Sequence, residues 1–290
     1  MLQAKVTAAD SQRGGFSDGL AARLQLSDGR RAFAKAVDAV ASPGVGGFHR
    51  RETAVAGGLP SGVPAPRLTG SYDDGQWVAL VFEDVDGKLP VQPWDATELE
   101  RVLGAVTDVA ERLTPAPQLN PPHAAPRLGG WARLALRPQA LAKLTAIAPG
   151  AAADLDLHLT LEAHLAEAIA GETLTHGDLY PFNVLLTGKR VVFVDWPHAW
   201  AGPGHADLVM LLGSVALSGI DPEPYAAGHP LLTGVESEAV DVLISAQAGF
   251  LLAAACSADS SADARLLHMM AQLGLASLRW LSGRWHSEGR

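Results

Sequence analysis

Apolar and polar residues alternate near the start of the chain, which is the pattern of a half-buried β-strand. In residues 20–26 the larger apolar side chains fall on every second position, and Ser-Asp-Gly at 27–29 then predicts a tight turn. After this turn, Phe33, Lys35 and Val37 share one face of a second predicted strand. The pattern therefore predicts a β-hairpin with a lysine between two apolar neighbours on one face.

The next segments predict one short helix and one strongly apolar strand. Residues 49–56 form a helical run that ends at the glycine pair 57–58, and a Pro- and Gly-rich connector follows at 60–66. Residues 76–82 are mostly apolar and predict a strand that ends at 83–87. We expect the boundary between two lobes of the protein at the end of this strand.

Beyond this boundary the apolar residues follow a helical period. Residues 95–113 predict an amphipathic helix, 157–170 a second helix and 205–212 a buried helix, and 235–281 contain two or three more. The segment 114–130 is rich in Pro, Asn and Gly and predicts a loop. The face expected to be buried in the first of these helices consists of Leu99, Val102, Leu103, Val106, Val109 and Leu113.

A second predicted hairpin is flanked by polar residues. Residues 184–187 and 191–194 are short apolar strands on either side of a turn at 188–190. In a hairpin the start of the first strand lies beside the end of the second. Asn183 precedes the first strand and Asp195 ends the second, so we expect these two side chains at the same end.

The residues at this end of the hairpin suit phosphoryl transfer. A carboxamide oxygen of Asn183 beside the carboxylate of Asp195 forms a hard oxygen site for Mg²⁺, with phosphate oxygens as further ligands. Asp178, in the loop that leads to Asn183, can act as the base for an acceptor hydroxyl near the bound phosphate. We expect His176 to brace this loop rather than to transfer a proton.

These motifs also carry a family resemblance. The sequence HGDLYPFN at 176–183, followed by VDW at 194–196, resembles the aminoglycoside phosphotransferase family, also called the phosphotransferase enzyme family. Protein kinases usually carry Arg at the position of Gly177 and Asp-Phe-Gly at the position of 195–197, so the resemblance is to the branch that acts on small molecules. It is specific over about residues 174–212.

One position departs from the family pattern. Many members have Gly-Asp-Pro where this chain has Gly-Pro-Gly at 202–204, which puts the local substrate-side loop in question. The nearby Asp207 opens a predicted helix. Its carboxylate is able either to accept backbone N–H bonds from the loop of Asp178 or to cap its own helix, and the sequence leaves both alternatives open.

The resemblance implies an α+β, bilobal, protein-kinase-like fold. A small β-rich N-lobe would span residues 1–84 and a mostly helical C-lobe residues 85–290, with ATP, or alternatively GTP, between them. Lys35 is the candidate for the strand lysine that contacts the nucleotide phosphates, and Glu52 on the next helix is its expected partner. A solvated lysine on an edge strand and a solvated glutamate on a small helix are the competing interpretations.

Two further nucleotide contacts are expected in the N-lobe. The glycine-rich turn at 13–19, with Gly15 and Ser17, would let backbone N–H groups approach the phosphates. In the resembling family the strand at 76–82 leads to a hinge whose backbone binds adenine, which places Glu83 and Val85 there as backbone contacts. No Walker sequence G-x-x-x-x-G-K-[ST] is present.

The composition indicates the class of protein and the compartment in which it works. The 290 residues are 48% hydrophobic and 18% charged, which is typical of a globular protein with a sizeable core. The single cysteine, Cys256, excludes an internal disulfide and fits a reducing compartment, and residues 1–5 show no secretory signal. The runs 208–217 and 249–255 are too short to cross a bilayer. We therefore expect a cytoplasmic protein that does not bind membranes.

The net charge of the chain indicates which kinds of binding partner are favoured. With 31 acidic against 22 basic residues the net charge is −9, which argues against nucleic acid and favours a cationic acceptor by long-range attraction. The carboxylates first considered for this attraction are Asp207, Asp259 and Asp263, each of which could equally be a helix cap or a solvated loop residue. Oligomeric state cannot be inferred from the sequence.

We therefore expect an ATP-dependent phosphotransferase with an alcohol group as acceptor. An aminoglycoside-like or other antibiotic is the leading acceptor class. The first alternative is a metabolic kinase of the same fold that acts on a choline-like, amino-sugar or ribose-like compound, since the motif residues contact the nucleotide and not the acceptor. The second is a nucleotide-binding pseudokinase, which would lack a catalytic Asp or a metal ligand, and Asp178, Asn183 and Asp195 are all present.

Overall fold

The computed structural model describes residues 2–12, 19–119, 124–257 and 263–287. Gly15 and Ser17, the predicted phosphate contacts of the glycine-rich turn, lie outside the described residues, as does Asp259.

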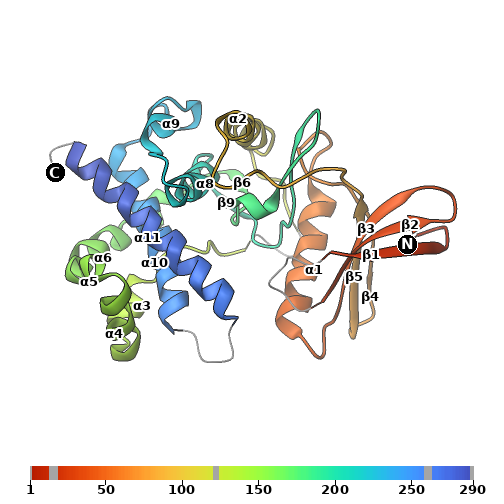
Figure 1. Cartoon of the computed structure of the whole chain (residues 1–290), viewed down its shortest axis with the longest axis horizontal. Coiled ribbons are helices and arrows are strands. Elements are labelled where there is room, and N and C mark those ends of the chain that lie inside the picture. The colour runs from red at the N-terminus through yellow and green to blue at the C-terminus, as the bar shows by residue number, and fades with distance from the viewer. Residues whose placement is uncertain (1, 13–18, 120–123, 258–262, 288–290) are drawn as a thin grey trace.

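The N-terminal part is a five-stranded antiparallel sheet with one helix against it (Figure 1). The strand order is β1-β2-β3-β5-β4, and the helix α1 packs on β3, β4 and β5. Here, β1 spans Val6–Ser11, β2 Leu20–Leu26, β3 Arg31–Asp38, β4 Leu68–Asp73, β5 Trp77–Glu83 and α1 Pro43–Gly58. The sheet therefore ends at Glu83, while the predicted lobe boundary after residue 84 stays a prediction.

Alternation along β3 decides what faces α1. Phe33 and Val37 pack in the apolar cluster that includes Val45 and Ala56 of α1. Lys35 lies between them on the same face, as the two-residue period predicts, and pairs in register with Leu80 of β5. The strand thus points a single ammonium group at the helix.

The remainder of the chain is mostly helical (Figure 1). Its helices are α2 Ala96–Arg112, α3 Trp131–Ala135, α4 Pro138–Ile147, α5 Pro149–Ala153, α6 Leu155–Ala163, α7 Leu165–Ala168, α8 Ala206–Leu217, α9 Glu223–Ala227, α10 Ser237–Ser257 and α11 Ala264–Ser287. Two short hairpin-like pairs complete it, β6 Thr173–Thr175 with β9 Trp200–Gly202, and β7 Val184–Leu186 with β8 Val191–Phe193. The α+β, bilobal, protein-kinase-like fold is confirmed.

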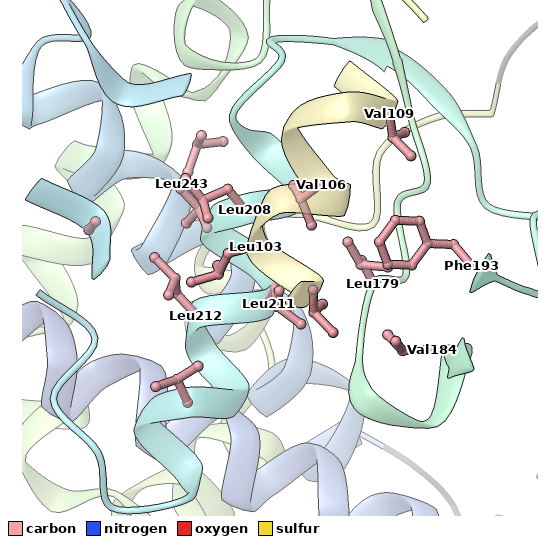
Figure 2. Packing of buried hydrophobic residues seen from close by; sticks show 14 of the residues in the cluster. Leu103, Val106, Val109, Leu179, Val184, Phe193, Leu208, Leu211, Leu212 and Leu243 are labelled. Carbon is pink, nitrogen blue, oxygen red and sulfur yellow. The ribbon is translucent and has the colours of Figure 1, made fainter. Parts of the chain in front are cut away.

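Helix α2 forms where its sequence predicts it. Asp95 caps the helix by accepting a bond from the backbone N–H of Glu98 at 3.0 Å. The predicted apolar stripe is buried and meets side chains of α8 and of the β7–β8 hairpin (Figure 2). Figure 2 shows Leu179 between Val106, Val109 and Phe193, so the loop of Asp178 is anchored in this core.

Several predicted boundaries were wrong. Helix α1 begins at Pro43 instead of residue 49, and the glycine at 46 lets the helix approach Ala39 closely, since a Cβ on Gly46 would lie 2.5 Å from that of Ala39. The helix predicted at 157–170 starts at Leu155 and is interrupted at His164. Strands β1 and β4 and helices α3, α4, α5 and α9 were not predicted, because they are short or mostly exposed and carry little periodicity.

Helix α10 alone, among the described residues, is long and apolar enough to cross a membrane by length and composition. Of its most apolar window, 78% is buried within the protein, against α3, α4, α6, α7, α8 and α11. A buried core helix passes the same test, and the surrounding helices give α10 that role here.

Candidate active site

The β7–β8 hairpin brings Asn183 and Asp195 to one end, as the spacing predicts. Val184 pairs with Phe193, and the N–H of Val194 donates to the carbonyl of Asn183 at 2.9 Å. Asp195 follows with φ of 69°, in the left-handed region that non-glycine residues seldom adopt. Such a backbone conformation is common at functional sites, because the surrounding structure must hold it.

Asp178 lies beside this hairpin with its side chain 18% exposed, and that side chain has two partners. The Asn183 amide donates to its carbonyl at 2.8 Å and to its Oδ2 at 3.2 Å. Nη1 of Arg127 donates to its Oδ1 at 3.0 Å. Burial raises the pKa of Asp178 above the usual range, and the positive charge of Arg127 opposes that rise.

His176 spans the loop of Asp178. Its Nε2 lies 2.9 Å from the carbonyl oxygen of Val194, and the N–H of Asp178 donates to its Nδ1 at 3.3 Å. These contacts fit a neutral ring that carries its proton on Nε2. The ring thereby links the loop to the residue before Asp195, and a role in proton transfer is not needed to explain its position.

The structure decides between the two roles that the sequence left open for Asp207, an anchor for the loop of Asp178 or a cap of its own helix. Its Oδ2 accepts the N–H of His176 at 2.6 Å and its Oδ1 accepts the N–H of Gly177 at 3.0 Å. No capping bond from its side chain to its own helix is found in the described part of the chain. Asp207 therefore anchors the loop of Asp178 and is buried.

Gly177 shows why the arginine of protein kinases is absent at this position. Its φ is 75°, and a Cβ there would lie 2.3 Å from the carbonyl oxygen of His198. A side chain is excluded by both the backbone conformation and the close approach.

Lys35, Glu52 and Asp195 form one ionic cluster. Nζ of Lys35 lies 2.8 and 2.9 Å from the two carboxylate oxygens of Glu52 and 2.9 Å from Oδ1 of Asp195. Burial works against the charge of Lys35, but the two carboxylates raise its pKa above the usual value. Burial favours protonation of Asp195, yet Lys35 holds its pKa below the usual value. The expected pairing of Lys35 with Glu52 is thus present in the structure.

The donor set at the hairpin end fits a magnesium ion. The Asn183 amide nitrogen is turned toward Asp178, and within the described ranges nothing donates to the amide oxygen. Asp195 is about half exposed, and Lys35 contacts only one of its oxygens. Among the described residues, no group of three His, Cys, Asp or Glu side chains could hold a metal. Bound phosphate would therefore have to supply further ligands.

The predicted hinge shows ordinary packing of its side chains. Arg190 lies 3.2 Å from the carboxylate of Glu83, while the carbonyl of Val85 accepts bonds from Arg23 at 3.1 Å and from Gly87 at 3.0 Å. Asp84 lies within ion-pair distance of Arg23. Contact of Glu83 and Val85 with adenine stays a prediction. Because the carbonyl of Val85 already accepts two hydrogen bonds, its backbone N–H is the group to test for a bond to adenine.

Two of the three carboxylates proposed to attract a cationic acceptor have other partners in the structure. Asp207 is committed to backbone N–H groups, and Asp263 is paired with Arg265 at 3.1 Å. The residue that sequence reasoning missed is Arg127, which contacts Asp178 directly. It stands in a loop without periodicity, 51 residues from its partner, so no local pattern indicates the contact.

Residues 14–231 match the sequence family described as the phosphotransferase enzyme family. A curated protein described as a LicA homolog, from Mycoplasma capricolum subsp. capricolum, is 33% identical over 58 residues. That match covers 20% of this chain and 24% of the other protein, so the chain aligns with only a minor part of this relative.

Solved structures share the fold over nearly the whole chain. A choline/ethanolamine kinase family protein from Mesorhizobium loti has a TM-score of 0.58 at 15% identity, covering 94% of this chain and 87% of its own. An amicoumacin kinase bound to AMP-PNP, Ca²⁺ and amicoumacin has 0.55 at 12%, covering 93% and 88%. A macrolide 2′-phosphotransferase from Brachybacterium faecium has 0.51 at 18%, covering 94% and 93%. At such identities the similarity establishes the fold alone.

Proposed function

The chain belongs to the phosphotransferase enzyme family, and we propose that it transfers the γ-phosphoryl group of ATP to a hydroxyl group of a small molecule, with Mg²⁺ as the metal. The observation that carries the proposal is the meeting of Asp178, Asn183 and Asp195 at one hairpin end, beside the Lys35–Glu52 pair. Catalysis of this kind is mainly positioning and electrostatics, which such an arrangement can provide.

Asp178 is the base in this proposal. The acceptor hydroxyl donates its proton to Asp178 while its oxygen forms a bond to the γ-phosphorus. The bond between that phosphorus and the bridging oxygen breaks, and its electron pair leaves with ADP. Asn183 and Arg127 fix the two carboxylate oxygens of Asp178, so the base is held before the acceptor arrives.

Asn183 and Asp195 would hold the metal, which when bound neutralises charge on the phosphate oxygens. Lys35 is set by Glu52 to contact phosphate oxygens as well. Lys35 also contacts one oxygen of Asp195, so the other oxygen of that carboxylate would remain for the metal. We propose ATP as the phosphoryl donor with GTP as the alternative, and a comparison of turnover with the two nucleotides decides between them.

The acceptor is proposed at the level of a small hydroxylated compound. The similar structures include kinases named for antibiotics and kinases named for choline or fructosamine. An antibiotic and a metabolite would therefore use the same nucleotide machinery. A panel of hydroxylated compounds in an ADP-release assay distinguishes the two classes, and its failure with every compound would favour the pseudokinase alternative.

The reaction is tested first at the base. Asp178→Ala should lower kcat by roughly 10²–10⁴, the usual scale for removal of a general base. Mg·ATP affinity, measured by calorimetry, should survive, because the base acts on the acceptor. Near-wild-type turnover by this variant would reject the assignment of Asp178.

The metal ligands are tested separately. Asp195→Ala should weaken Mg²⁺-dependent ATP binding as well as turnover, because the carboxylate would be lost from the metal site. Calorimetry of this variant with and without Mg²⁺ gives the measurement. An unchanged Mg·ATP affinity would remove Asp195 from the metal site.

We also propose that the protein works in the cytoplasm. Cys256 is buried in the cluster around α3, α4 and α10, as expected for an inert thiol, and burial raises its pKa. Localisation of a tagged full-length chain in cell fractions would test this.

A further inference from the structure

Arg127 is held in place by the backbone on both sides. The N–H of Ala124 donates to the carbonyl of Ala199 at 3.1 Å, just beyond Asp195 along the chain. The N–H of Gly129 donates to the carbonyl of Ala246 in α10 at 2.8 Å. The segment 124–129 is thus tied to the loop after β8 at one end and to α10 at the other, with Arg127 between.

The side chain of Arg127 is also fixed. Its guanidinium carbon lies 4.9 Å from the ring centre of Phe250, one turn beyond Ala246 in α10. From this aromatic surface Nη1 reaches Oδ1 of Asp178 at 3.0 Å. Stacking on one face and an ion pair at the edge leave the guanidinium little freedom to turn, so its charge has a defined position.

Other charged groups around Asp178 do not replace this contact. Asp195 carries a negative charge, and Lys35 is engaged by Glu52 and Asp195. The hydrogen bonds of His176 fit a neutral ring, and burial lowers the pKa of His198 to about 3, so this ring is neutral at pH 7. Among the described residues, Arg127 is therefore the cation in direct contact with the base.

Two contacts set the orientation of the base. Arg127 occupies Oδ1 of Asp178, while Asn183 contacts Oδ2, so the two partners together set the plane of the carboxylate.

We propose that Arg127 is a positioning and specificity-determining residue: it holds the carboxylate of Asp178 in a fixed orientation, and its fixed positive charge selects an acceptor that is neutral or anionic near its reacting hydroxyl. This inference rests on the proposed phosphoryl transfer. The proposal disagrees with the cationic acceptor that the net charge favours. A positive charge beside the base lies much closer to the reacting hydroxyl than most surface charges do, so its effect on the acceptor is stronger and less screened by salt.

The positioning role is tested with Arg127→Met and Arg127→Lys, using ADP release with water as the acceptor. Arg127→Met should lower kcat at pH 7 by tenfold or more, since the carboxylate of Asp178 loses the contact that fixes its Oδ1. KM for Mg·ATP should stay within twofold. Arg127→Lys should restore kcat in part, because it keeps the charge without the planar geometry.

Two variants control this experiment. Phe250→Leu removes the aromatic surface under the guanidinium and should lower kcat by a smaller factor. Arg137→Met removes an exposed arginine from the same part of the chain and should leave kcat and KM unchanged. A kcat of Arg127→Met that matches the wild type, or a loss confined to KM for Mg·ATP, at normal folding by circular dichroism, would overturn the positioning role.

The specificity role is tested with three alcohols of similar size: choline, its neutral isostere 3,3-dimethylbutan-1-ol, and 3-hydroxypropionate. The wild-type enzyme should show a kcat/KM at least tenfold higher for the neutral or anionic alcohol than for choline, and Arg127→Met should narrow that ratio. If none of the three is used, the charge of the best acceptor in the hydroxyl-compound panel decides in their place.

Faster transfer to choline than to its isostere would overturn the specificity role. Failure of the proposed function looks different, because the wild-type enzyme would then release no ADP with water or with any alcohol.

Discussion

At the scale of single residues, one ammonium group serves two carboxylates. Lys35 contacts both oxygens of buried Glu52 and one oxygen of Asp195, and it is itself mostly buried. Burying the charges of Lys35 and Glu52 is tolerated only because the two groups are paired at hydrogen-bond distance. Removing either one leaves an uncompensated buried charge, so these two side chains should behave as a unit.

We expect Lys35 and Glu52 to be coupled in catalysis. Lys35→Ala and Glu52→Ala should each raise KM for ATP or lower kcat, and the double variant should lose less than the sum, by roughly 0.5–3 kcal/mol. The pair of Lys88 and Glu98, 2.7 Å apart with Lys88 67% exposed, is a control that should show no coupling in kcat/KM. Strict additivity at Lys35 and Glu52 would return Glu52 to a structural role.

Asp207 gives the second prediction at this scale. Asp207→Asn leaves one oxygen for two N–H donors, so the backbone of His176 or Gly177 loses its partner. We expect a loss of about 1–3 kcal/mol in unfolding free energy and a fall in kcat, as measured by urea denaturation and ADP release. Asp221→Asn, at an exposed carboxylate that also accepts a backbone N–H, should change the unfolding free energy by less than about 0.5 kcal/mol.

At the scale of elements, an arginine joins three helices far from the site. Nε of Arg284 in α11 donates to Asp241 of α10 at 2.7 Å, and Nη1 donates to Glu223 of α9 at 2.6 Å. Arg284 and Asp241 are both buried. Trp280 of α11 also donates to Glu223, at 2.9 Å. The network therefore holds α9 and α10 against α11 through charge-assisted bonds.

Arg284→Ala should destabilise the protein by about 3–5 kcal/mol, because it removes the positive charge beside the buried carboxylate of Asp241, which would then keep only neutral donors such as Trp285. Thermal or urea unfolding measures this, and kcat of the folded fraction should be unaffected. Arg265→Ala is the matched control in the same helix, since Arg265 is 84% exposed and pairs only at the surface. Equal losses in both variants would show that the buried network contributes no more than a surface pair.

At the scale of the whole molecule, one core connects the helical part to the catalytic loop. Side chains of α2, α8, α10 and the β7–β8 hairpin pack together around Leu179, the residue after Asp178 (Figure 2). Because protein interiors are close-packed, contacts with several helices together fix the position of this loop. The sheet contributes Lys35 from the other side, so the site needs both halves of the fold.

The burial of α10 leads to a prediction for the whole chain. Although α10 is apolar enough to cross a bilayer, its apolar surface is already covered by neighbouring helices. We expect the full chain to remain in the supernatant after ultracentrifugation without detergent and to keep the same hydrodynamic radius when detergent is added. Recovery with the membrane pellet, released only by detergent, would contradict the buried placement of α10.

The sequence by itself determined the features that depend on local spacing. Alternation placed Lys35 on the face toward α1, and the order of residues 178–195 predicted that Asn183 and Asp195 meet. The buried apolar face of α2 was likewise predicted from its helical periodicity. In each case a strand or helix period, or the geometry of a hairpin, fixes the relative positions of residues close in sequence.

Only the tertiary structure decided contacts between distant segments. Asp207 reaches His176 across 31 residues, and Arg127 reaches Asp178 across 51. Helix α10 turned out to be a core helix, and the edge strands β1 and β4 joined a sheet that their own residues barely indicate. Such contacts arise when separate elements pack on one core. The local periodicity of a sequence does not indicate which distant loop or strand will pack beside it. The contact of Arg127 with Asp178 could therefore be found only in the folded chain.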